Sequence, residues 1–376
     1  MEYRVLIVEH DRLMIEKLSQ VVKATQGFDL VARYQVVNDA LGQGQVFNPN
    51  LILLDIENQN SVALIADFLK VYPHASILCM GEKWRAESAS HILKAGARGY
   101  IIKPFTGAEL QEAVDTFSKL GGEGGCETLV FFSPKGKSGK TTLIANLAVS
   151  LVRKTHERVG IIDADLQFGD MAVFFNLAPQ TTIVEATRDE RFLSPVTLHP
   201  YYMPVTQNVS VLCGTAAPNL IDKVAIESFE NVITMSRSLF RYLLIDVPPG
   251  FNPTSIAAAE QSTTTFLVSM VNGAYEIAHM KNALEIFKDW DDYEERVKTI
   301  FTRVEPCNAE SQQNLSQQLG YKVTAIIPNE YSIVSDAADN GKMATDLKPD
   351  SPLAKSVDRL ADDIIGRKHR IRWDEA

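Results

Sequence analysis

The chain has 376 residues, of which 45% are hydrophobic and 22% charged, so it is long enough for two domains and has the composition of an ordinary globular protein. This composition excludes an intrinsically disordered chain and a fibrous repeat. With 37 basic and 47 acidic residues the net charge is −10, which argues against a protein that coats nucleic acid through bulk positive charge.

The cysteines and the apolar segments indicate in which cellular compartment the protein is expected. The four cysteines form no CxxC pair and no Cys/His cluster, which fits a reducing compartment and provides no zinc framework. The first ten residues, MEYRVLIVEH, contain acids where a signal peptide has an apolar run, and no stretch reaches the roughly 18 apolar residues of a membrane-spanning helix. We therefore expect a cytoplasmic protein whose contact with a membrane is at most peripheral.

Between Tyr3 and Lys119, short apolar runs alternate with amphipathic stretches. The runs are too short for helices and nearly continuous in apolar character, as strands buried on both faces are. The pattern predicts five parallel strands in a doubly wound, flavodoxin-like α/β domain over residues 1–120. The expected strands are Val5–Val8, Leu30–Tyr34, Leu51–Leu54, Ile77–Met80 and Tyr100–Ile102, and the expected helix faces include Leu13, Leu18, Val21 and Val22, then Leu64, Ile65, Phe68 and Leu69.

A glycine-rich segment follows and predicts a linker over residues 121–127. A second alternation of strands and helices then fills residues 128–376. Right-handed crossovers predict a mainly parallel sheet of about seven strands, with ligands at the carboxyl ends of the strands. The expected strands are Leu129–Ser133, Val159–Asp163, Val209–Leu212, Tyr242–Asp246, Thr265–Val268, Val297–Thr302 and Val323–Ile327.

The strongest motif is Ser133–Thr142, SPKGKSGKTT, which follows an expected strand directly and opens an expected helix. Gly136 and Gly139 let backbone N–H groups turn toward phosphate oxygens, and the helix amino terminus adds positive charge. In such a loop Lys140 reaches the outer phosphates and the Thr141 hydroxyl binds magnesium. The candidate nucleotide-binding residues are Lys135, Gly136, Lys137, Ser138, Gly139, Lys140, Thr141 and Thr142.

A strict GxxxxGK[ST] loop would have glycine at position 134, where this chain has proline. The lysine-bearing variant KGxxGKTT instead resembles the deviant Walker loop of the MinD/ParA group of ATPases. The resemblance implies ATP and Mg²⁺ as cofactors, and a homodimer in the ATP state whose interface is crossed by the signature lysine, here Lys135. The group usually has a second glycine where this chain has Lys137.

Two further segments match the same group. In DADLQFGD, the resemblance makes Asp163 a partner of the magnesium water shell and Asp165 the residue that orients the attacking water. In LLIDVPPG, Asp246 ends an apolar strand and would hold water of the same metal. The catalytic candidates are thus Lys135, Lys140 and Asp165, and the metal candidates Thr141, Asp163 and Asp246.

For the base, the group uses backbone contacts after two late strands, where this chain has Thr302-Arg303 and Ile327-Pro328-Asn329-Glu330. The resemblance therefore implies that Arg303 and Pro328 contact the base. The group commonly has asparagine in place of Thr302.

The first domain resembles a response-regulator receiver, with Asp55 at the phosphoacceptor position and Lys103 at that of the phosphoryl-stabilising lysine. Receivers also need magnesium held by an acid pair after the first strand, and a hydroxyl after the fourth. Here Glu9-His10-Asp11 replaces the usual acid pair, and Gly81 stands at the hydroxyl position. We expect a degenerate receiver site of Glu9, Asp55 and Lys103, in which Asp55 and Lys103 form an ion pair, and a domain that binds partners.

A degenerate receiver joined to a MinD-like ATPase resembles the TadZ/CpaE family, the localisation ATPases of Tad (Flp) pilus assembly. The resemblance implies a weak ATPase that helps to recruit the pilus secretion machinery at a cell pole or at the inner face of the membrane. Its most distinctive pieces are DADLQFGD, DVPPG, Ser335–Gly341 and Ser351-Pro352-Leu353.

Three other functions stay open from the sequence. A ParA-like partition ATPase binds DNA, but the net charge of −10 makes a nucleic-acid partner improbable, and only residues 367–372 form a basic run. A MinD-like membrane ATPase needs a terminal amphipathic helix, and the apolar residues around that run suggest one, although a frayed tail is the alternative. The third is a nucleotide-bound scaffold without turnover.

Overall fold

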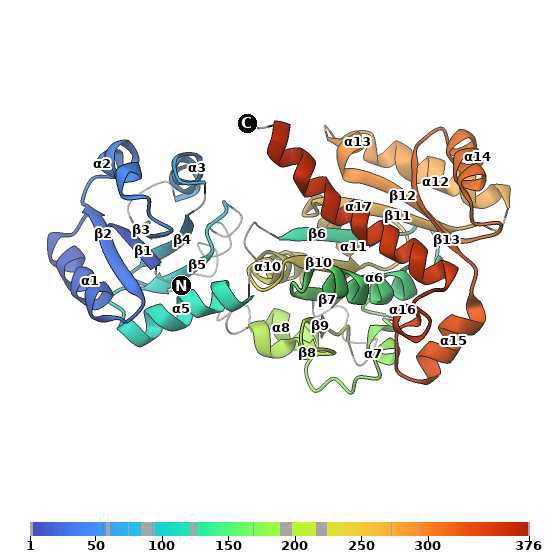
Figure 1. The fold of residues 1–376 in the computed structure, drawn as a ribbon, viewed down its shortest axis with the longest axis horizontal. Helices are drawn as coiled ribbons and strands as arrows, with labels where there is room; N and C mark the ends of the chain where they lie inside the picture. Colours follow the sequence, from blue (N-terminus) through green and yellow to red (C-terminus); the bar gives the residue numbers. More distant parts are fainter. Residues whose placement is uncertain are drawn as a thin grey trace. The chain divides into compact units, whose positions relative to one another are not determined.

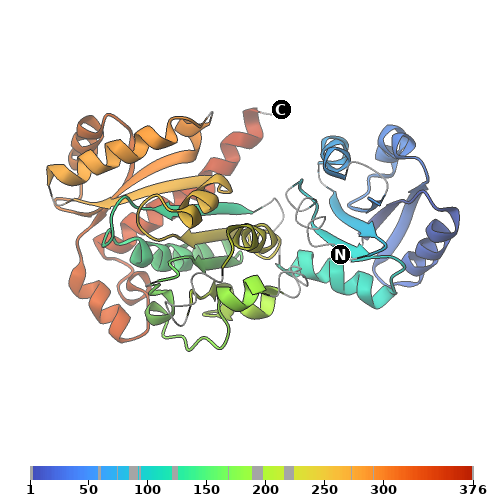
Figure 2. The ribbon, with the colours of Figure 1, turned by 180° about the vertical axis from the view of Figure 1, so that it is seen from behind.

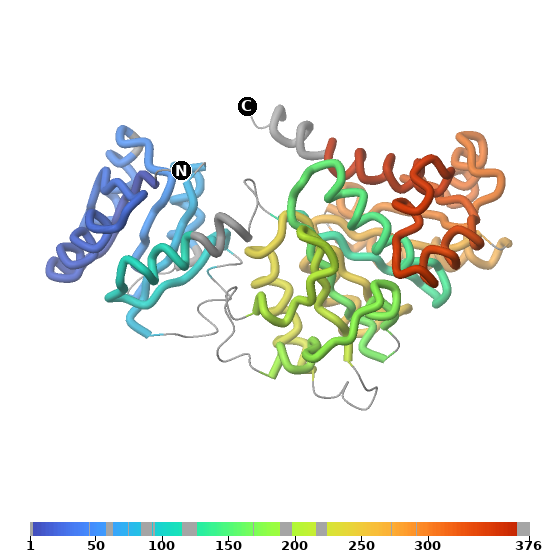
Figure 3. The backbone as a smooth tube through the Cα atoms, turned by 60° about the horizontal axis from the view of Figure 1, so that its bottom comes forward, coloured from blue at the N-terminus to red at the C-terminus, as the bar shows by residue number. Residues whose placement is uncertain are grey.

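The computed structural model describes residues 3–57, 61–73, 75–83, 92, 95–120, 126–167, 169–188, 198–215, 224–271, 273–290 and 292–374. Figure 3 traces the backbone, coloured along the chain from the N-terminus to the C-terminus. The chain forms two compact units, the first of which includes Met1–Glu123 and the second Gly124–Arg188 and Phe240–Ala376. Each unit is an α/β fold built on its own sheet (Figure 1), as expected from the two alternations of strands and helices.

The first unit has a parallel five-stranded sheet in the order β2-β1-β3-β4-β5. Successive residues of β1 point to opposite faces, so Val5 and Ile7 pack with α1 and α5, while Leu6 and Val8 pack on the side of α2 and α3. All five predicted strands are present. The elements are β1 Tyr3–Val8, α1 Arg12–Ala24, β2 Phe28–Tyr34, α2 Val37–Gln43, η1 Gly44–Phe47, β3 Leu51–Asp55, α3 Ser61–Val71, β4 Ser76–Gly81, β5 Gly99–Ile102 and α5 Gly107–Leu120.

The expected apolar face of α1 was wrong at one position. Leu13 is 74% exposed, whereas Ile15, Leu18 and Val22 are buried. The Asp11 side chain caps the helix by accepting a hydrogen bond from Met14 N, which fixes where the helix begins. From that start the spacing of Ile15, Leu18 and Val22 follows one face of the helix, and Leu13 lies away from it.

The second unit has an eight-stranded sheet in the order β13-β12-β11-β6-β10-β7-β9-β8. All seven predicted strands are present and parallel. The eighth, β8, pairs antiparallel with β9 at the sheet edge and has two residues, too few to give a sequence pattern. The strands are β6 Glu127–Phe132, β7 Val159–Asp163, β8 Met203–Pro204, β9 Val209–Leu212, β10 Tyr242–Asp246, β11 Thr264–Met270, β12 Val297–Val304 and β13 Val323–Pro328.

Helices cover both faces of this sheet. Helices α6 and α17 share one core cluster with the sheet, and α10, α11 and α12 lie on the opposite face, which Figure 2 brings forward. The helical elements are α6 Lys140–Thr155, α7 Met171–Phe174, α8 Ile183–Arg188, η3 His199–Tyr201, α10 Ile226–Ser236, α11 Pro253–Glu260, α12 Ala274–Phe287, α13 Tyr293–Arg296, α14 Ala309–Leu319, α15 Tyr331–Asp339, α16 Ala344–Leu347 and α17 Pro352–Asp374.

Two sequence expectations concern the ends of these units. The linker residues 121–125 lie outside the described residues, and β6 already begins at Glu127, the last residue assigned to the linker. The basic run at 367–372 falls within the bounds of α17. Among the described residues, no helix has the length and apolar character needed to cross a bilayer.

Candidate functional site

The loop from Ser133 to Gly139 joins the carboxyl end of β6 to the amino end of α6. Gly139 is the residue before the helix and has φ = 80°, a left-handed conformation that suits glycine. Lys137 also has a positive φ, 63°, which costs a non-glycine residue about 1 kcal/mol. The loop thus has a strained backbone directly before a 16-residue helix. Such a backbone is expected where amide groups turn toward an anion at the start of a helix.

Hydrogen bonds from two other strand ends hold this loop. Gly250 N, after β10, donates to the Ser133 carbonyl at 2.9 Å. Thr302, at the end of β12, donates from Oγ1 to the Ser138 carbonyl at 2.6 Å and is 4% exposed. The Ser138 hydroxyl is itself buried and has no hydrogen-bond partner among the described residues, so it is an orphaned donor in the middle of the loop. This fits a site that binds an acceptor-rich ligand such as phosphate.

Three lysines in the loop differ in exposure. Lys140, the first residue of α6, is 8% exposed, whereas Lys135 and Lys137 are exposed. A buried ammonium suits a contact to a ligand held inside the loop. An exposed lysine can instead reach outward, as the expected interface lysine must.

Asp163 and Asp246 end neighbouring strands and are register partners in the pairing of β7 with β10. Both are buried, and Thr141 donates from Oγ1 to Asp246 Oδ2 at 2.6 Å. Burial and the neighbouring Asp246 raise the pKa of Asp163 well above its usual value, and burial raises the pKa of Asp246 to about 6. Two buried carboxylates with a hydroxyl beside them form a donor set that suits a hard divalent cation.

The segment after β7 keeps Asp163 oriented. Asp163 accepts hydrogen bonds from Asp165 N at 3.3 Å and from Met171 N at 3.2 Å. Asp165 itself is less buried than Asp163 and lies at the rim of the same strand end. The placement therefore brings all three predicted acids to the carboxyl edge of the sheet, beside the loop.

A pocket opens beside the loop on the side of β12 and β13, and it brings both predicted base-contact segments next to Gly139 and Thr142. Arg303 has a left-handed φ of 55° and an exposed side chain. The remaining walls come from α6, α15 and α17. The lining residues are Gly139, Thr142, Leu143, Asn146, Thr302, Arg303, Ile327, Pro328, Asn329, Glu330, Tyr331, Val334, Leu353 and Val357.

Sequence reasoning missed several of these residues. Leu353 and Val357 belong to α17, about 200 positions after the loop, so no local motif predicts that they line the pocket. Asn146 is one helical turn beyond Thr142 and donates to its carbonyl at 2.8 Å, while its amide oxygen accepts from Thr345 N at 3.0 Å. The available signal was a polar residue in the middle of the apolar run 143–149.

In the first unit, the predicted receiver residues meet at the carboxyl ends of β1, β3 and β5. Lys103 Nζ donates to Glu9 Oε2 at 2.7 Å and to Asp55 Oδ1 at 2.8 Å, and all three side chains are buried. Burial lowers the pKa of Lys103, but its bonds to Asp55 and Glu9 outweigh burial and raise it overall, so the ammonium stays charged. The expected Asp55–Lys103 ion pair is present.

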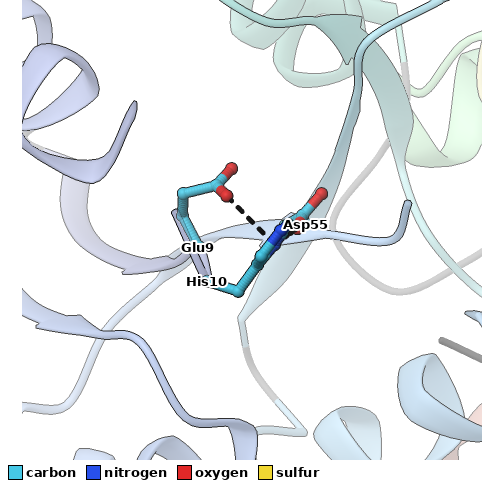
Figure 4. Close-up of side chains that lie close together, drawn as sticks. All are labelled: Glu9, His10 and Asp55. Atoms are coloured by element: carbon cyan, nitrogen blue, oxygen red, sulfur yellow. Dashed lines mark hydrogen bonds and ion pairs between the residues drawn. The ribbon is translucent and has the colours of Figure 1, made fainter. Parts of the chain in front are cut away.

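His10, which stands where a receiver has its second acid, joins this cluster. Its Nδ1 lies 2.6 Å from Asp55 Oδ2 and 3.2 Å from Glu9 Oε1. Figure 4 shows the three side chains turned toward one another.

The hydroxyl position has no space for a side chain. A Cβ atom on Gly81 would lie 1.7 Å from the Tyr100 hydroxyl, so Tyr100 occupies the volume that serine or threonine would need. Gly81 therefore leaves room for the Tyr100 side chain at the position where a receiver has its hydroxyl residue.

Comparison with known proteins agrees with both units. The family model for response regulator receiver domains matches residues 5–115, and that for the CobQ/CobB/MinD/ParA nucleotide binding domain matches residues 129–343. An uncharacterized ATP-binding protein of Methanocaldococcus jannaschii is 26% identical over 249 residues, covering 64% of this chain and 88% of the relative.

Solved structures show the same fold for the second unit. A ParA family ATPase from Chlorobium tepidum has a TM-score of 0.58 at 17% identity, covering 62% of this chain and 98% of that one. MinD from Pyrococcus horikoshii, solved with Mg-ADP, has a TM-score of 0.54 at 21% identity, covering 64% and 96%. Since the nucleotide-binding match spans more than half of the sequence, the chain belongs to the CobQ/CobB/MinD/ParA nucleotide-binding domain family and carries a receiver domain in addition.

Proposed function

We propose that the chain is an ATP-dependent, dimerising localisation ATPase that helps to position and assemble the Tad/Flp pilus secretion machinery at a cell pole. One observation supports nucleotide binding most strongly. The Ser133–Gly139 loop, the Thr141–Asp246 hydrogen bond and an apolar pocket lie together at one edge of the sheet. A MinD relative that was solved with Mg-ADP supports the same ligands here. The pilus part rests on the resemblance to the TadZ/CpaE family.

In this proposal, Lys140 and the loop amides hold the phosphates of ATP, and Arg303 and Pro328 border the base. Thr141, Asp163 and Asp246 hold Mg²⁺ directly or through its water, and the ion supplies positive charge to the phosphates. Asp165, at the rim, orients the attacking water, and Lys135 reaches the site of a second copy. Because each residue has a single proposed role, substitutions can test these roles one at a time.

The nucleotide part is tested by two substitutions with opposite signatures. Lys140→Ala removes the buried charge at the phosphates, and a charge-assisted contact of about 1.5–3 kcal/mol corresponds to a loss of ATP affinity of roughly tenfold or more. Asp165→Ala should keep ATP affinity and slow phosphate release. Calorimetry and a phosphate-release assay measure the two effects, with the exposed Lys322→Ala as the matched lysine control.

Three results would contradict these roles. Unchanged ATP affinity in Lys140→Ala would refute the phosphate site. Affinity lost in parallel with turnover in Asp165→Ala would make that acid structural. A parent chain that binds ATP but never releases phosphate would be a scaffold rather than an ATPase.

The pilus part is tested in cells that carry Tad pilus genes. Deletion of the gene should abolish surface pili, and a fluorescent fusion should form a polar focus that Lys140→Ala disperses. Normal pili after deletion would refute the assignment even if ATP binding is intact. A fusion spread over the nucleoid or the whole membrane would instead favour the DNA-partition or the membrane-positioning alternative.

A further inference from the structure

The receiver unit contains a second cluster of ligand atoms that the nucleotide site does not use. Glu9 and His10 follow β1 and Asp55 ends β3, and β1 and β3 are adjacent strands, so their carboxyl ends meet at one edge. One nitrogen of His10 and one oxygen from each acid lie within 4.8 Å of one another. In the part of the chain that the structure describes, no other group of three His, Cys, Asp or Glu side chains meets this spacing.

The carboxylates of this cluster are held in place by other groups. Lys103 donates a hydrogen bond to one carboxylate oxygen of each acid. The other two oxygens, Glu9 Oε1 and Asp55 Oδ2, face His10. Backbone N–H groups of Asp11 and Glu57 also bind these acids, at 3.0 and 3.3 Å. Such outer contacts orient metal ligands and fix which oxygen faces the ion.

The ligand types favour a transition metal over magnesium. Mg²⁺ prefers oxygen ligands in octahedral geometry, whereas imidazole nitrogen suits Zn²⁺, Co²⁺ and Ni²⁺. Exchange of the second acid for His10 removes an oxygen ligand and a negative charge from the position where a receiver holds magnesium. The His10 side chain is 52% exposed while both acids are buried, so an ion can enter from the imidazole side.

The surroundings do not favour phosphoryl transfer at the same place. The Tyr100 hydroxyl fills the position of the missing side chain at Gly81, and Lys103 is already bound to both acids. A cluster that keeps its acids and its lysine but lacks the hydroxyl retains the groups for cation binding alone.

We propose that Glu9, His10 and Asp55 form a binding site for a divalent first-row transition-metal ion, with Zn²⁺ as the reference ion. The ion is bound by His10 Nδ1, Glu9 Oε1 and Asp55 Oδ2, with water at the remaining positions. This site shares no residue with the nucleotide site, so the proposed metal binding can be tested separately from the proposed ATPase activity.

The test is a calorimetric titration of the full chain with Zn²⁺ in excess Mg²⁺, which saturates sites built for magnesium. We expect one equivalent of Zn²⁺ per chain. His10→Asn is the informative variant because its amide can still donate a hydrogen bond to Asp55 but is a poor metal ligand. It should weaken Zn²⁺ binding by about tenfold or more, since even changes beyond the direct ligands cost 10- to 100-fold.

Two further variants give the controls. Asp246→Asn removes a carboxylate from the nucleotide site and should leave Zn²⁺ affinity unchanged. His10→Asp restores the acid pair and should exchange Zn²⁺ preference for Mg²⁺ binding in the receiver unit. Circular dichroism checks that each variant is folded.

The proposal is overturned if the folded parent binds no Zn²⁺ in excess Mg²⁺, or if His10→Asn binds it as tightly as the parent. Loss of the Zn²⁺ equivalent in Asp246→Asn but not in His10→Asn would also overturn it, because the ion would then lie in the nucleotide site.

Discussion

Asp246 shows how a single buried residue can make the nucleotide site dependent on pH. Its carboxyl is buried beside Asp163, and its pKa of about 6 lies close to neutral pH although Lys140 and the Thr141 hydroxyl favour the charged form. A cation held at this place would compete with a proton once the pH falls toward about 6. Metal binding at Asp246 would therefore be coupled to the release of a proton.

We predict that Mg²⁺-dependent ATP affinity falls as pH is lowered through 6, by up to about tenfold per pH unit, because protonated Asp246 no longer attracts the ion. Titrations at several pH values measure the effect. Asp246→Asn should lose this component, and comparison with it cancels the titration of ATP itself. Equal pH profiles in the two proteins would contradict the role of Asp246.

The stability of the nucleotide-free protein should depend on pH in the opposite direction to ATP affinity. The raised pKa means that the nucleotide-free native state binds a proton more tightly than the unfolded chain does. The contribution of Asp246 to the free energy of unfolding is therefore largest at acidic pH and is lost as the pH rises from about 4 to about 6. Bound Mg²⁺ and ATP would restore stability at neutral pH by mass action.

At the scale of elements, the strands were predictable and the contacts between distant helices were not. Central strands such as β3 and β10 are nearly continuous apolar runs, because both sheet faces are covered there, and such runs stand out in the sequence. The Ser133–Thr142 loop was predictable because all its chemistry is local. The wall that Leu353 and Val357 give to the pocket depends on how α17 packs, which no local pattern encodes.

Ion pairs join α17 to α6, the helix that begins with Lys140. Asp358 accepts hydrogen bonds from Ser150 and Arg153, both at 2.5 Å, and Asp362 pairs with Lys154 at 2.8 Å. The Asp358 side chain is 28% exposed, whereas that of Asp362 is 62% exposed. Less exposed charges are less screened by water, so the two acids should differ in their contribution to stability.

We expect Asp358→Ala to lower the free energy of unfolding by about 1 kcal/mol, because two donors lose their acceptor. Asp362→Ala is the matched control and should change it by less than about 0.5 kcal/mol. Urea unfolding without nucleotide measures both values. Equal effects of the two substitutions would show that burial does not distinguish these ion pairs.

At the scale of the whole molecule, the sequence predicted two α/β units and the family of each, while the state of the receiver needed the structure. From the sequence, Gly81 and His10 were only departures from a pattern. The close approach of Tyr100 to Gly81 and the place of His10 between two acids depend on tertiary packing. These contacts turn a degenerate site into a specific hypothesis about metal binding.

We propose that ATP drives two copies of the chain together through an exposed lysine of the loop. Lys135 is exposed while Lys140 is buried, so removal of Lys135 should leave ATP binding in place and prevent association. Lys137 is also exposed and close in sequence, so a second nearby cation can substitute for Lys135. The double variant Lys135→Ala/Lys137→Ala is therefore the decisive protein.

Multi-angle light scattering of the parent and this double variant, each in ATP and in ADP, is the most direct measurement. We predict a dimer of the parent in ATP, a monomer in ADP, and a double variant that binds ATP but stays monomeric in both nucleotides. A double variant that dimerises with ATP as the parent does, or a parent whose mass is the same in ATP and ADP, would contradict the claim.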